Sequence, residues 1–358
     1  MFTAKYTISN KILKNIGVID ASREVIASMP LIPGWEVKLK KEAMERTIHH
    51  SVRLDGNPLS MEDIKDILDG KEINRSDLEI QEATNYKNAL KFIEHIISQI
   101  GIGRSYVLTL DTIMEFHHQL VNKIIDQSQA GLFRMRQVVL KNTKTGEVSY
   151  LPPPAAEVPY LMEDLINWIN SEHSKEIHPV IKAGIIHFEF SRVHPYTVAN
   201  GAVARLVSLL ILFLEDYRLR GFVSLDEYFA EDPFLYFHTL QTVFNQRVID
   251  SHERDLTPWL EYFCEGVAVE FSKTKERVKR VSSEAHVKDK LGDEVVLNER
   301  QMMLMEYLHR HKQMKNSDFR KIFPEHSDDT VLRELRALKK MGLINKEGGT
   351  KKAIYVIK

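Results

Sequence analysis

The residues best suited to chemistry lie in one short segment, from His194 to Arg205. Asn200 and Gly201 come just before an apolar helix, whose first backbone N–H groups have no helical partner and can bind an anion. Arg205, one turn further on, can face the same anion, and His194 at the opposite edge can take a proton from a nucleophile. A histidine before proline is, on its own, more often structural. The joint spacing is what predicts a phosphate-binding turn with a base beside it.

Helices must position this turn. The preceding helix is expected to end at Ser191-Arg192, and the following one to begin at about Ala202. Residues 206–214 are apolar on all sides of the second helix, which predicts that it lies at the centre of its domain. Residues 137–151 break the helical pattern and predict a β-hairpin, which Pro152 ends. The fold class expected is therefore mainly α, with one hairpin.

The C-terminal residues predict a separate winged-helix domain. Helices are expected after Asn298, Asn316 and Ser327, followed by a hairpin that ends the chain. From Asn298 onward fourteen residues are basic and eight acidic. One interpretation places the third helix in a DNA groove, with Lys351-Lys352 on phosphates. The other is packing or dimerisation, since three acidic residues of the third helix would repel phosphates: Asp328, Asp329 and Glu334.

Composition limits the other classes of function. The chain has 358 residues and a net charge of −1, so nucleic-acid binding requires a local patch. A single cysteine, Cys264, excludes an internal disulfide. The apolar run 206–214 is about half the length of a membrane span, and no signal peptide is apparent. We expect a soluble, cytoplasmic protein with no membrane partner. The domains expected are 1–100, 101–275, a linker at 276–296, and 297–358.

The turn resembles the signature of the Fic (Fido) family, His-Pro-Phe-x-Asp/Glu-Gly-Asn-Gly-Arg-x-x-Arg. The hairpin at 137–151 resembles the family's flap, and Ser51–Asn57 resembles its inhibitory helix motif, Ser/Thr-x-x-x-Glu-Gly/Asn. Tyr236-Phe237 resembles an aromatic pair near the adenine. The resemblance thus makes residues 101–275 the Fic core and places the inhibitory-type motif in residues 1–100.

This resemblance implies transfer of AMP from Mg-ATP to a hydroxyl of a target protein docked on the flap. It implies that His194 is the general base and that Asp55 pairs with Arg205 to block productive ATP binding. The inhibitory motif comprises Ser51, Asp55 and Gly56. The nucleotide-binding positions implied are Val198, Ala199, Asn200, Gly201, Ala202, Arg205, Tyr236 and Phe237.

Three residues depart from the family signature. Val198 replaces the acid that would hold Mg²⁺, which requires oxygen ligands, so no metal site is predicted. Ala199 replaces a glycine where the backbone is expected to approach a phosphate or adopt positive φ. Ala202 replaces an arginine that would stabilise developing charge. Adenylylation with Mg-ATP is therefore predicted to be weak or lost, while ATP can still bind. The alternative is a catalytically silent scaffold acting as a winged-helix, DNA-binding regulator; a homodimer is left open.

Overall fold

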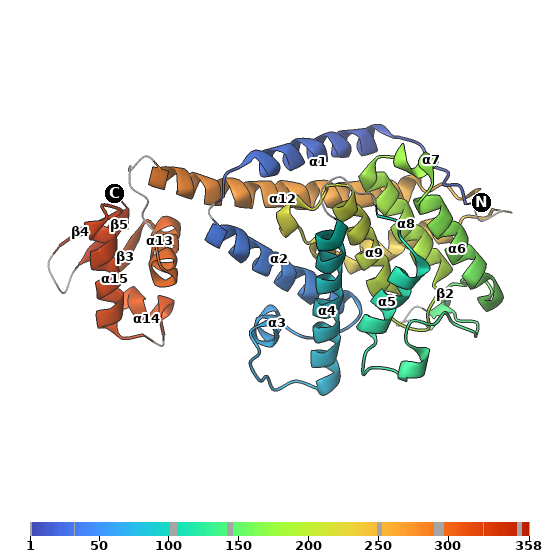
Figure 1. Ribbon diagram of the computed structural model, residues 1–358, viewed down its shortest axis with the longest axis horizontal. Helices are drawn as coiled ribbons and strands as arrows, with labels where there is room; N and C mark the ends of the chain where they lie inside the picture. Colours follow the sequence, from blue (N-terminus) through green and yellow to red (C-terminus); the bar gives the residue numbers. More distant parts are fainter. Residues whose placement is uncertain are drawn as a thin grey trace. The chain divides into compact units, whose positions relative to one another are not determined.

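The structure is a computed structural model that describes residues 2–31, 33–100, 106–141, 146–248, 253–289, 297–324, 326–348 and 353–357. The chain divides into two compact units, Met1–Ser282 and Ser283–Lys358. Figure 1 shows a mainly helical protein with a small hairpin in the first unit. The hairpin turn at 142–145 and the predicted phosphate contacts Lys351 and Lys352 lie outside the described residues.

Two buried helices form the centre of the first unit. α8 and α9 pack against each other, and α4, α5 and α6 surround them (Figure 1). Nearly every side chain of both helices is buried, as the apolar run predicts for the second of them. The helices of this unit are α1 (Asn10–Ser28), α2 (Pro33–Leu54), α3 (Met61–Leu68), α4 (Asp77–Ile100), α5 (Leu110–Leu120), α6 (Val158–Ile169), α7 (Glu172–Lys175), α8 (Pro179–Val193), α9 (Asn200–Leu214), α10 (Leu225–Glu231), α11 (Pro233–Phe244) and α12 (Thr257–Asp289).

Several predicted boundaries need correction. α9 begins at Asn200 rather than Ala202, because the helix starts directly after the turn. α12 continues to Asp289, so residues 276–289 of the predicted linker are helical. The flap strands β1 (Leu140–Lys141) and β2 (Val148–Tyr150) are antiparallel but shorter than predicted, since their register is irregular between Leu140 and Lys141.

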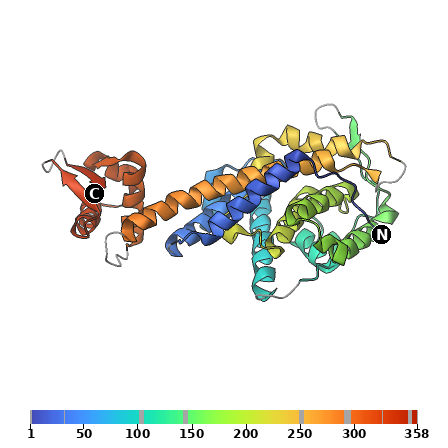
Figure 2. The same cartoon turned by 90° about the horizontal axis from the view of Figure 1, so that it is seen from above.

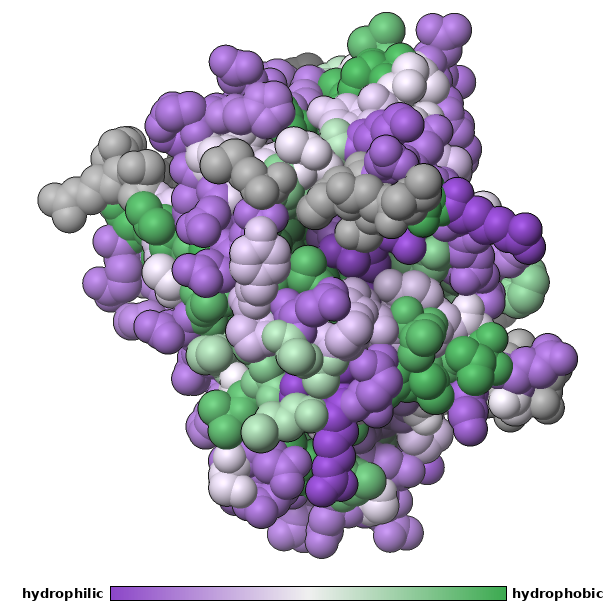
Figure 3. All heavy atoms as spheres, turned by 90° about the vertical axis from the view of Figure 1, so that its right-hand side faces the viewer, coloured by the Kyte–Doolittle hydropathy of each residue, from purple (hydrophilic) through white to green (hydrophobic). Residues whose placement is uncertain are grey.

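Long helices cover the central pair. Figures 1 and 2 show α1 lying along α12. The Ser9 hydroxyl donates to a Glu261 carboxylate oxygen at 2.6 Å, and Lys11 pairs with Glu265 at 2.8 Å. Figure 3 shows hydrophobic side chains in separate groups among polar ones on one face of the molecule. None of the helices that the structure describes has the length and apolarity needed to cross a bilayer.

The second unit has its own core and a three-stranded antiparallel sheet in the order β3-β5-β4. The sequence predicts three helices and the terminal hairpin, and it misses β3, which pairs Met314 with Tyr355. Three residues are too short a run to show strand periodicity. Its elements are α13 (Glu299–His311), β3 (Gln313–Lys315), α14 (Phe319–Ile322), α15 (Asp328–Lys340), β4 (Ile344–Glu347) and β5 (Ile354–Ile357).

Candidate functional site

The turn between α8 and α9 begins with His194 in the left-handed region, at φ 51° and ψ 60°. Its backbone N–H donates to the Phe190 carbonyl at 3.0 Å, which ends α8. Burial lowers the pKa of the His194 side chain to about 4, although a hydrogen bond to the Ser191 backbone acts in the opposite direction. The imidazole is therefore neutral near pH 7, the form that can accept a proton.

Arg134 fixes this turn to the end of the flap. Its Nε donates to the His194 carbonyl at 2.8 Å, and a terminal nitrogen donates to the Pro153 carbonyl at 2.6 Å. Its own backbone N–H donates to the Pro195 carbonyl at 2.8 Å. The guanidinium is buried and thus holds several carbonyls that would otherwise lack donors. The sequence does not predict this arginine as part of the site, because it belongs to no spacing pattern.

The Asn200 side chain closes the turn on itself. Its Oδ1 accepts the Tyr196 N–H at 2.8 Å, and its Nδ2 donates to the Tyr196 carbonyl at 2.9 Å. The Tyr196 ring stacks on His117, with centroids 3.7 Å apart. The first helical hydrogen bond runs from the Val203 N–H to the Ala199 carbonyl. The side chain of Asn200 is thus used within the turn, and the first N–H groups of α9 are the donors for an anion.

Ala199 adopts positive φ, the conformation that the sequence analysis considers for this position. It lies at φ 61° and ψ 15° immediately before α9. A left-handed conformation costs a residue with a Cβ about 1–2 kcal/mol, whereas glycine adopts it freely. The missing glycine therefore leaves backbone strain in the turn.

Ala199→Gly should raise the free energy of unfolding by about 1 kcal/mol, because it removes this strain. Denaturant unfolding followed by circular dichroism measures the change. Ala204→Gly, in the buried interior of α9, is the control and should destabilise the protein. A destabilised Ala199→Gly variant would show that the positive φ carries no strain.

The turn forms one wall of a cavity of about 440 Å³. Asp55 and Glu82 also line it, and none of the lining residues that the structure describes carries a positive charge. Arg205, Tyr236 and Phe237 are not among the lining residues. The remaining lining residues are Val52, Tyr86, Leu120, Val121, Ile124, His194, Val198, Ala199, Asn200, Gly201 and Ala202.

Arg205 is held behind Asp55 in a dense network. A terminal nitrogen of Arg205 lies 2.8 Å from Asp55 Oδ2, and its Nε donates to the Ser51 hydroxyl at 2.9 Å. Gly56, at φ 95°, follows directly after the end of α2 and Asp55. The side chain of Arg205 is 2% exposed and that of Asp55 is 43% exposed. The structure thus brings together the predicted inhibitory motif and the last arginine of the turn.

The network holds a second carboxylate that the sequence does not predict. Asp226 Oδ1 lies 3.0 Å from Arg205 Nε, and the Tyr86 hydroxyl donates to it at 3.3 Å. Burial disfavours the charge on Arg205, but the carboxylates of Asp55 and Asp226 outweigh it and raise its pKa. Asp226 and Tyr86 come from α10 and α4, far from the turn in sequence, so no local motif could reveal them.

The predicted aromatic pair lies outside the cavity. The Tyr236 hydroxyl is buried 2.8 Å from His187 Nε2. Burial raises the pKa of Tyr236 to about 12, although Arg205 and its hydrogen bond to this tyrosine oppose the shift. Phe237 is 50% exposed. Tyr236 therefore supports Arg205 from within the core, and it is Phe237 that is open to solvent.

The residues present do not fit a Mg²⁺ ion in this cavity. Val198 has no side-chain ligand atom and is 43% exposed. The two lining carboxylates already have partners, since Asp55 pairs with Arg205 and Glu82 accepts from the Asn57 side chain at 2.7 Å. Among the residues that the structure describes, this cavity thus offers no carboxylate without a protein partner, and carboxylates are ligands that this cation prefers.

A group of three carboxylates lies elsewhere, with a lysine among them. Glu227, Glu231 and Glu270 place oxygens within 4.8 Å of one another. Lys273 Nζ lies 2.6 Å from Glu231 and 2.8 Å from Glu270, so its ammonium offsets part of the negative charge of the group. Burial raises the pKa of Glu270 to about 7, and the nearby Lys273 opposes this shift.

Glu270 should make the stability of the protein depend on pH. Its folded-state pKa of about 7 exceeds its ordinary value of 4.5, so the protonated acid stabilises the fold. That contribution is complete below about pH 4.5 and is lost as the pH rises to about 7, at a cost of about 3 kcal/mol at most. Unfolding of native protein and Glu270→Gln at several pH values tests this: the variant should be relatively more stable at pH 8 than at pH 5. A constant difference would contradict the assignment.

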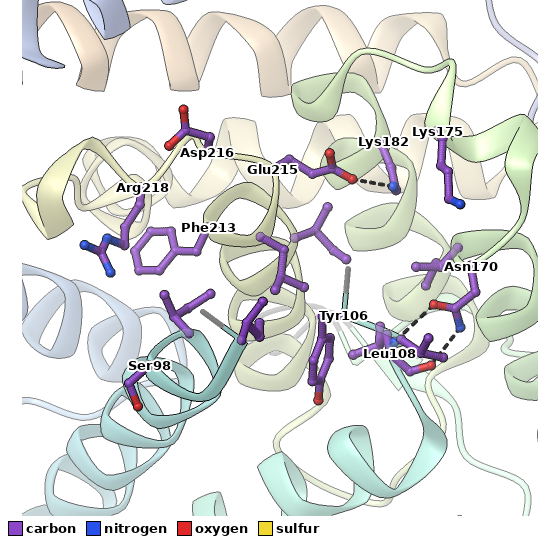
Figure 4. Close-up of a pocket in the computed structure, with 16 residues that line it drawn as sticks. Ser98, Tyr106, Leu108, Asn170, Lys175, Lys182, Phe213, Glu215, Asp216 and Arg218 are labelled. Carbon is purple, nitrogen blue, oxygen red and sulfur yellow. Dashed lines mark hydrogen bonds and ion pairs between the residues drawn. The ribbon is translucent and has the colours of Figure 1, made fainter. Parts of the chain in front are cut away.

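A cavity of about 650 Å³ also lies in the first unit, away from the turn (Figure 4). Its charged groups are largely paired: Lys182 Nζ lies 2.6 Å from a Glu215 oxygen. The Asn170 side chain bonds the Leu108 N–H and carbonyl. No residue predicted from the sequence to act in chemistry lines this cavity.

Comparison with known proteins gives a family match over a segment that contains the turn. Residues 107–212 match the Fic/DOC family. The "Protein adenylyltransferase Fic" of Drosophila sechellia is 29% identical over 206 residues, covering 56% of this chain and 38% of that protein. The chain thus matches about two fifths of the length of this relative.

Solved structures share the fold. A Fic family protein from Desulfovibrio desulfuricans has a TM-score of 0.66 at 20% identity, covering 100% of this chain and 98% of its own. Fic-1 (residues 134–508) from C. elegans has a TM-score of 0.59 at 22% identity, covering 75% and 74% of the two chains. Residues 107–212 are thus similar in sequence to the Fic/DOC family, and these solved structures share the fold of this chain.

Proposed function

We propose that this chain is a nucleotidyltransferase of the Fic type, held in a closed resting state, whose AMP transfer from Mg-ATP is weak or lost. The observation that carries the proposal is the cavity wall formed by His194 and the first N–H groups of α9, beside the Asp55–Arg205 ion pair. A neutral base and anion-binding amides in one cavity are what transfer of a phosphate-containing group to a hydroxyl requires.

The reaction proposed for this cavity is AMP transfer to a protein hydroxyl. The neutral imidazole of His194 takes the proton of the target hydroxyl while its oxygen bonds the α-phosphorus of ATP. The bond from that phosphorus to the bridging oxygen breaks, and pyrophosphate leaves. The N–H groups at the start of α9 hold phosphate oxygens during this step. Relatives that carry the name protein adenylyltransferase support this reaction class.

The residues of the same cavity are the reason why we propose a low rate of AMP transfer. Val198 and Ala202 supply neither a metal ligand nor a positive charge, and Arg205 is paired with two carboxylates. Asp55 and Glu82 add negative charge to the wall that a triphosphate would face. Each of these features removes stabilisation of charge in the transition state, so the deficits multiply in the rate.

Incubation with labelled ATP and Mg²⁺, alone and with cell lysate, tests the proposed function. Label transfer by the native protein that disappears in His194→Ala would support an active, attenuated enzyme. A rise in melting temperature with ATP but no label would support a lost reaction with retained binding. The absence of both label transfer and ATP-dependent stabilisation would overturn the assignment of a nucleotide to this cavity.

The target protein is proposed to dock on the flap hairpin. β1 and β2 form a two-stranded sheet, so an outer edge of the hairpin remains able to pair with an extended segment. Val148 is 57% exposed and Leu151 is 61% exposed beside it. Backbone pairing with apolar contacts on either side suits an extended peptide of a partner protein.

A second candidate function is DNA binding by residues 297–358, in the manner of a winged helix. The observation that favours it corrects the sequence analysis: Glu334 is buried, and its Oε2 accepts from Asn298 at 2.9 Å and Gln301 at 2.8 Å. This carboxylate therefore holds the two side chains of the α13 capping box, and it is directed into the unit rather than toward an approaching phosphate. The exposed residues on the later turns of α15 are basic: Arg333, Arg336, Lys339 and Lys340.

Retention of the full chain on duplex DNA should fall steeply with salt concentration. Arg333→Glu/Arg336→Glu should weaken binding and reduce the salt slope by about one for each phosphate that the protein no longer neutralises. Lys14→Glu/Lys91→Glu, which makes the same change in net charge in the first unit, is the control. Retention that ignores salt, or equal weakening in both variants, would count against this interface.

A further inference from the structure

Arg205 has two carboxylate partners in different surroundings. Asp55, just beyond the end of α2, has a side chain that is 43% exposed, whereas the side chain of Asp226 is 6% exposed. The two carboxylates approach different nitrogens of the guanidinium, Asp55 a terminal nitrogen and Asp226 the Nε. Asp226 also accepts from the buried hydroxyl of Tyr86. One partner is thus accessible to water and the other belongs to the core.

This difference determines which ion pair can open. Water and salt can replace the partner of an exposed carboxylate at little cost, so Asp55 can leave Arg205. Separating a buried pair leaves charges without solvation, which is strongly unfavourable. Arg205 therefore remains paired with Asp226 when Asp55 moves away.

α10 is itself held in place next to Asp226. In the adjacent residue, Glu227, one carboxylate oxygen lies 2.9 Å from Arg46 Nε of α2. The other lies 3.6 Å from a terminal guanidinium nitrogen of Arg277 of α12. Both contacts fix the helix that carries Asp226 to two other helices of the first unit. A displacement of the segment around Asp55 alone therefore leaves the Asp226 carboxylate where it is.

We propose that Asp226 is a second and permanent counter-ion of Arg205, which keeps the guanidinium out of the cavity whether or not Asp55 is in place. Asp226 is thus a positioning residue. The pairing of Arg205 with Asp226 can be tested without a nucleotide, whereas its consequence for ATP binding rests on the proposed function. It implies that release of the inhibitory segment is not sufficient to give the nucleotide an arginine, since that requires the Asp226 contact to break too.

Chemical modification of Arg205 tests, without any nucleotide, whether Asp226 keeps this arginine paired when Asp55 is removed. The full-length protein is treated with phenylglyoxal, and modification of Arg205 is followed by peptide mass spectrometry in native protein, Asp55→Gly, Asp226→Asn and the double variant. Asp55→Gly should react within about 2-fold of native, and the double variant at least about 10-fold faster, because only the double variant lacks both carboxylates.

Matched variants separate this effect from a general loosening of the fold. Glu94→Gln neutralises an exposed acid on α4 and removes no partner of Arg205, so it should leave the modification rate of Arg205 unchanged. Compared with the double variant, Asp55→Gly/Asp226→Glu has a carboxylate at position 226 again, so Arg205 should again be protected from modification. Modification of Asp55→Gly at least about 10-fold faster than native protein would overturn the proposal, and this comparison does not require any variant with Asp226→Asn to fold.

Binding of ATP, by isothermal titration, is measured on the same variants. Affinity that rises only in the double variant extends the role of Asp226 to the nucleotide. No binding in any variant would instead count against the proposed function, while the modification rates still decide the pairing of Arg205.

Discussion

Val198→Asp/Ala199→Gly/Ala202→Arg, built in the Asp55→Gly/Asp226→Asn background, is expected to transfer AMP at least about 10³-fold faster than that background alone. The aspartate supplies a carboxylate for Mg²⁺, which stabilises the transferring group by several kcal/mol. The new arginine adds positive charge to a wall that has none among its described residues. The glycine removes the strain at φ 61°.

The comparison is made within one background so that Arg205 is equally available in both proteins. The rate of label transfer from ATP to protein is measured with Mg²⁺ present, and His194→Ala in the restored protein is the control. Loss of transfer in that control assigns the proton acceptor. A restored variant that is no faster than its background would show that the three side chains are not what limits the rate.

The features predicted correctly are those whose residues are close in sequence or follow a strong period. The turn after α8 and the buried α9 depend on local spacing, and both are present in the structure. The contact between Asp55 and Arg205 is a long-range exception. The family resemblance predicts it, and it is present at 2.8 Å.

The features that sequence analysis missed depend on packing between distant elements. Arg134, Tyr86 and Asp226 are single residues with no periodic neighbour, and only the folded arrangement brings them to the turn. The sequence alone suggests that Glu334 is a repulsive surface charge, because a sequence does not show which side of a helix a partner covers. The structure gives it two amide donors from Asn298 and Gln301, so its charge is satisfied internally.

These contacts give Arg205 a structural role, which differs from that of an arginine free to bind a ligand in the cavity. A guanidinium that is 2% exposed, with a hydroxyl and two carboxylates around it, is a structural centre that joins α2, α9 and α10. The strained turn and the neutral His194 remain directed at the cavity. The first unit thus keeps the turn of the proposed nucleotide site, while Arg205 stabilises the fold.

Arg205→Met should therefore lower the free energy of unfolding by about 3–5 kcal/mol, a large effect for a single substitution. The substitution leaves Asp226 buried without its cation, and burial of an unpaired carboxylate is the main cost. Adding Asp226→Asn should recover part of this stability, because the neutral amide no longer requires the charge.

Denaturant unfolding of the three proteins measures both effects, with Arg53→Met as the control. Arg53 is an exposed arginine on α2, and its replacement should change the stability by no more than about 0.5 kcal/mol. If Arg205→Met were as mild as this control, Arg205 would not be a structural centre. If Asp226→Asn deepened the destabilisation instead of relieving it, the unpaired carboxylate would not be its cause. A ligand-binding arginine can be removed with little cost to the fold, whereas an arginine that neutralises a buried acid cannot.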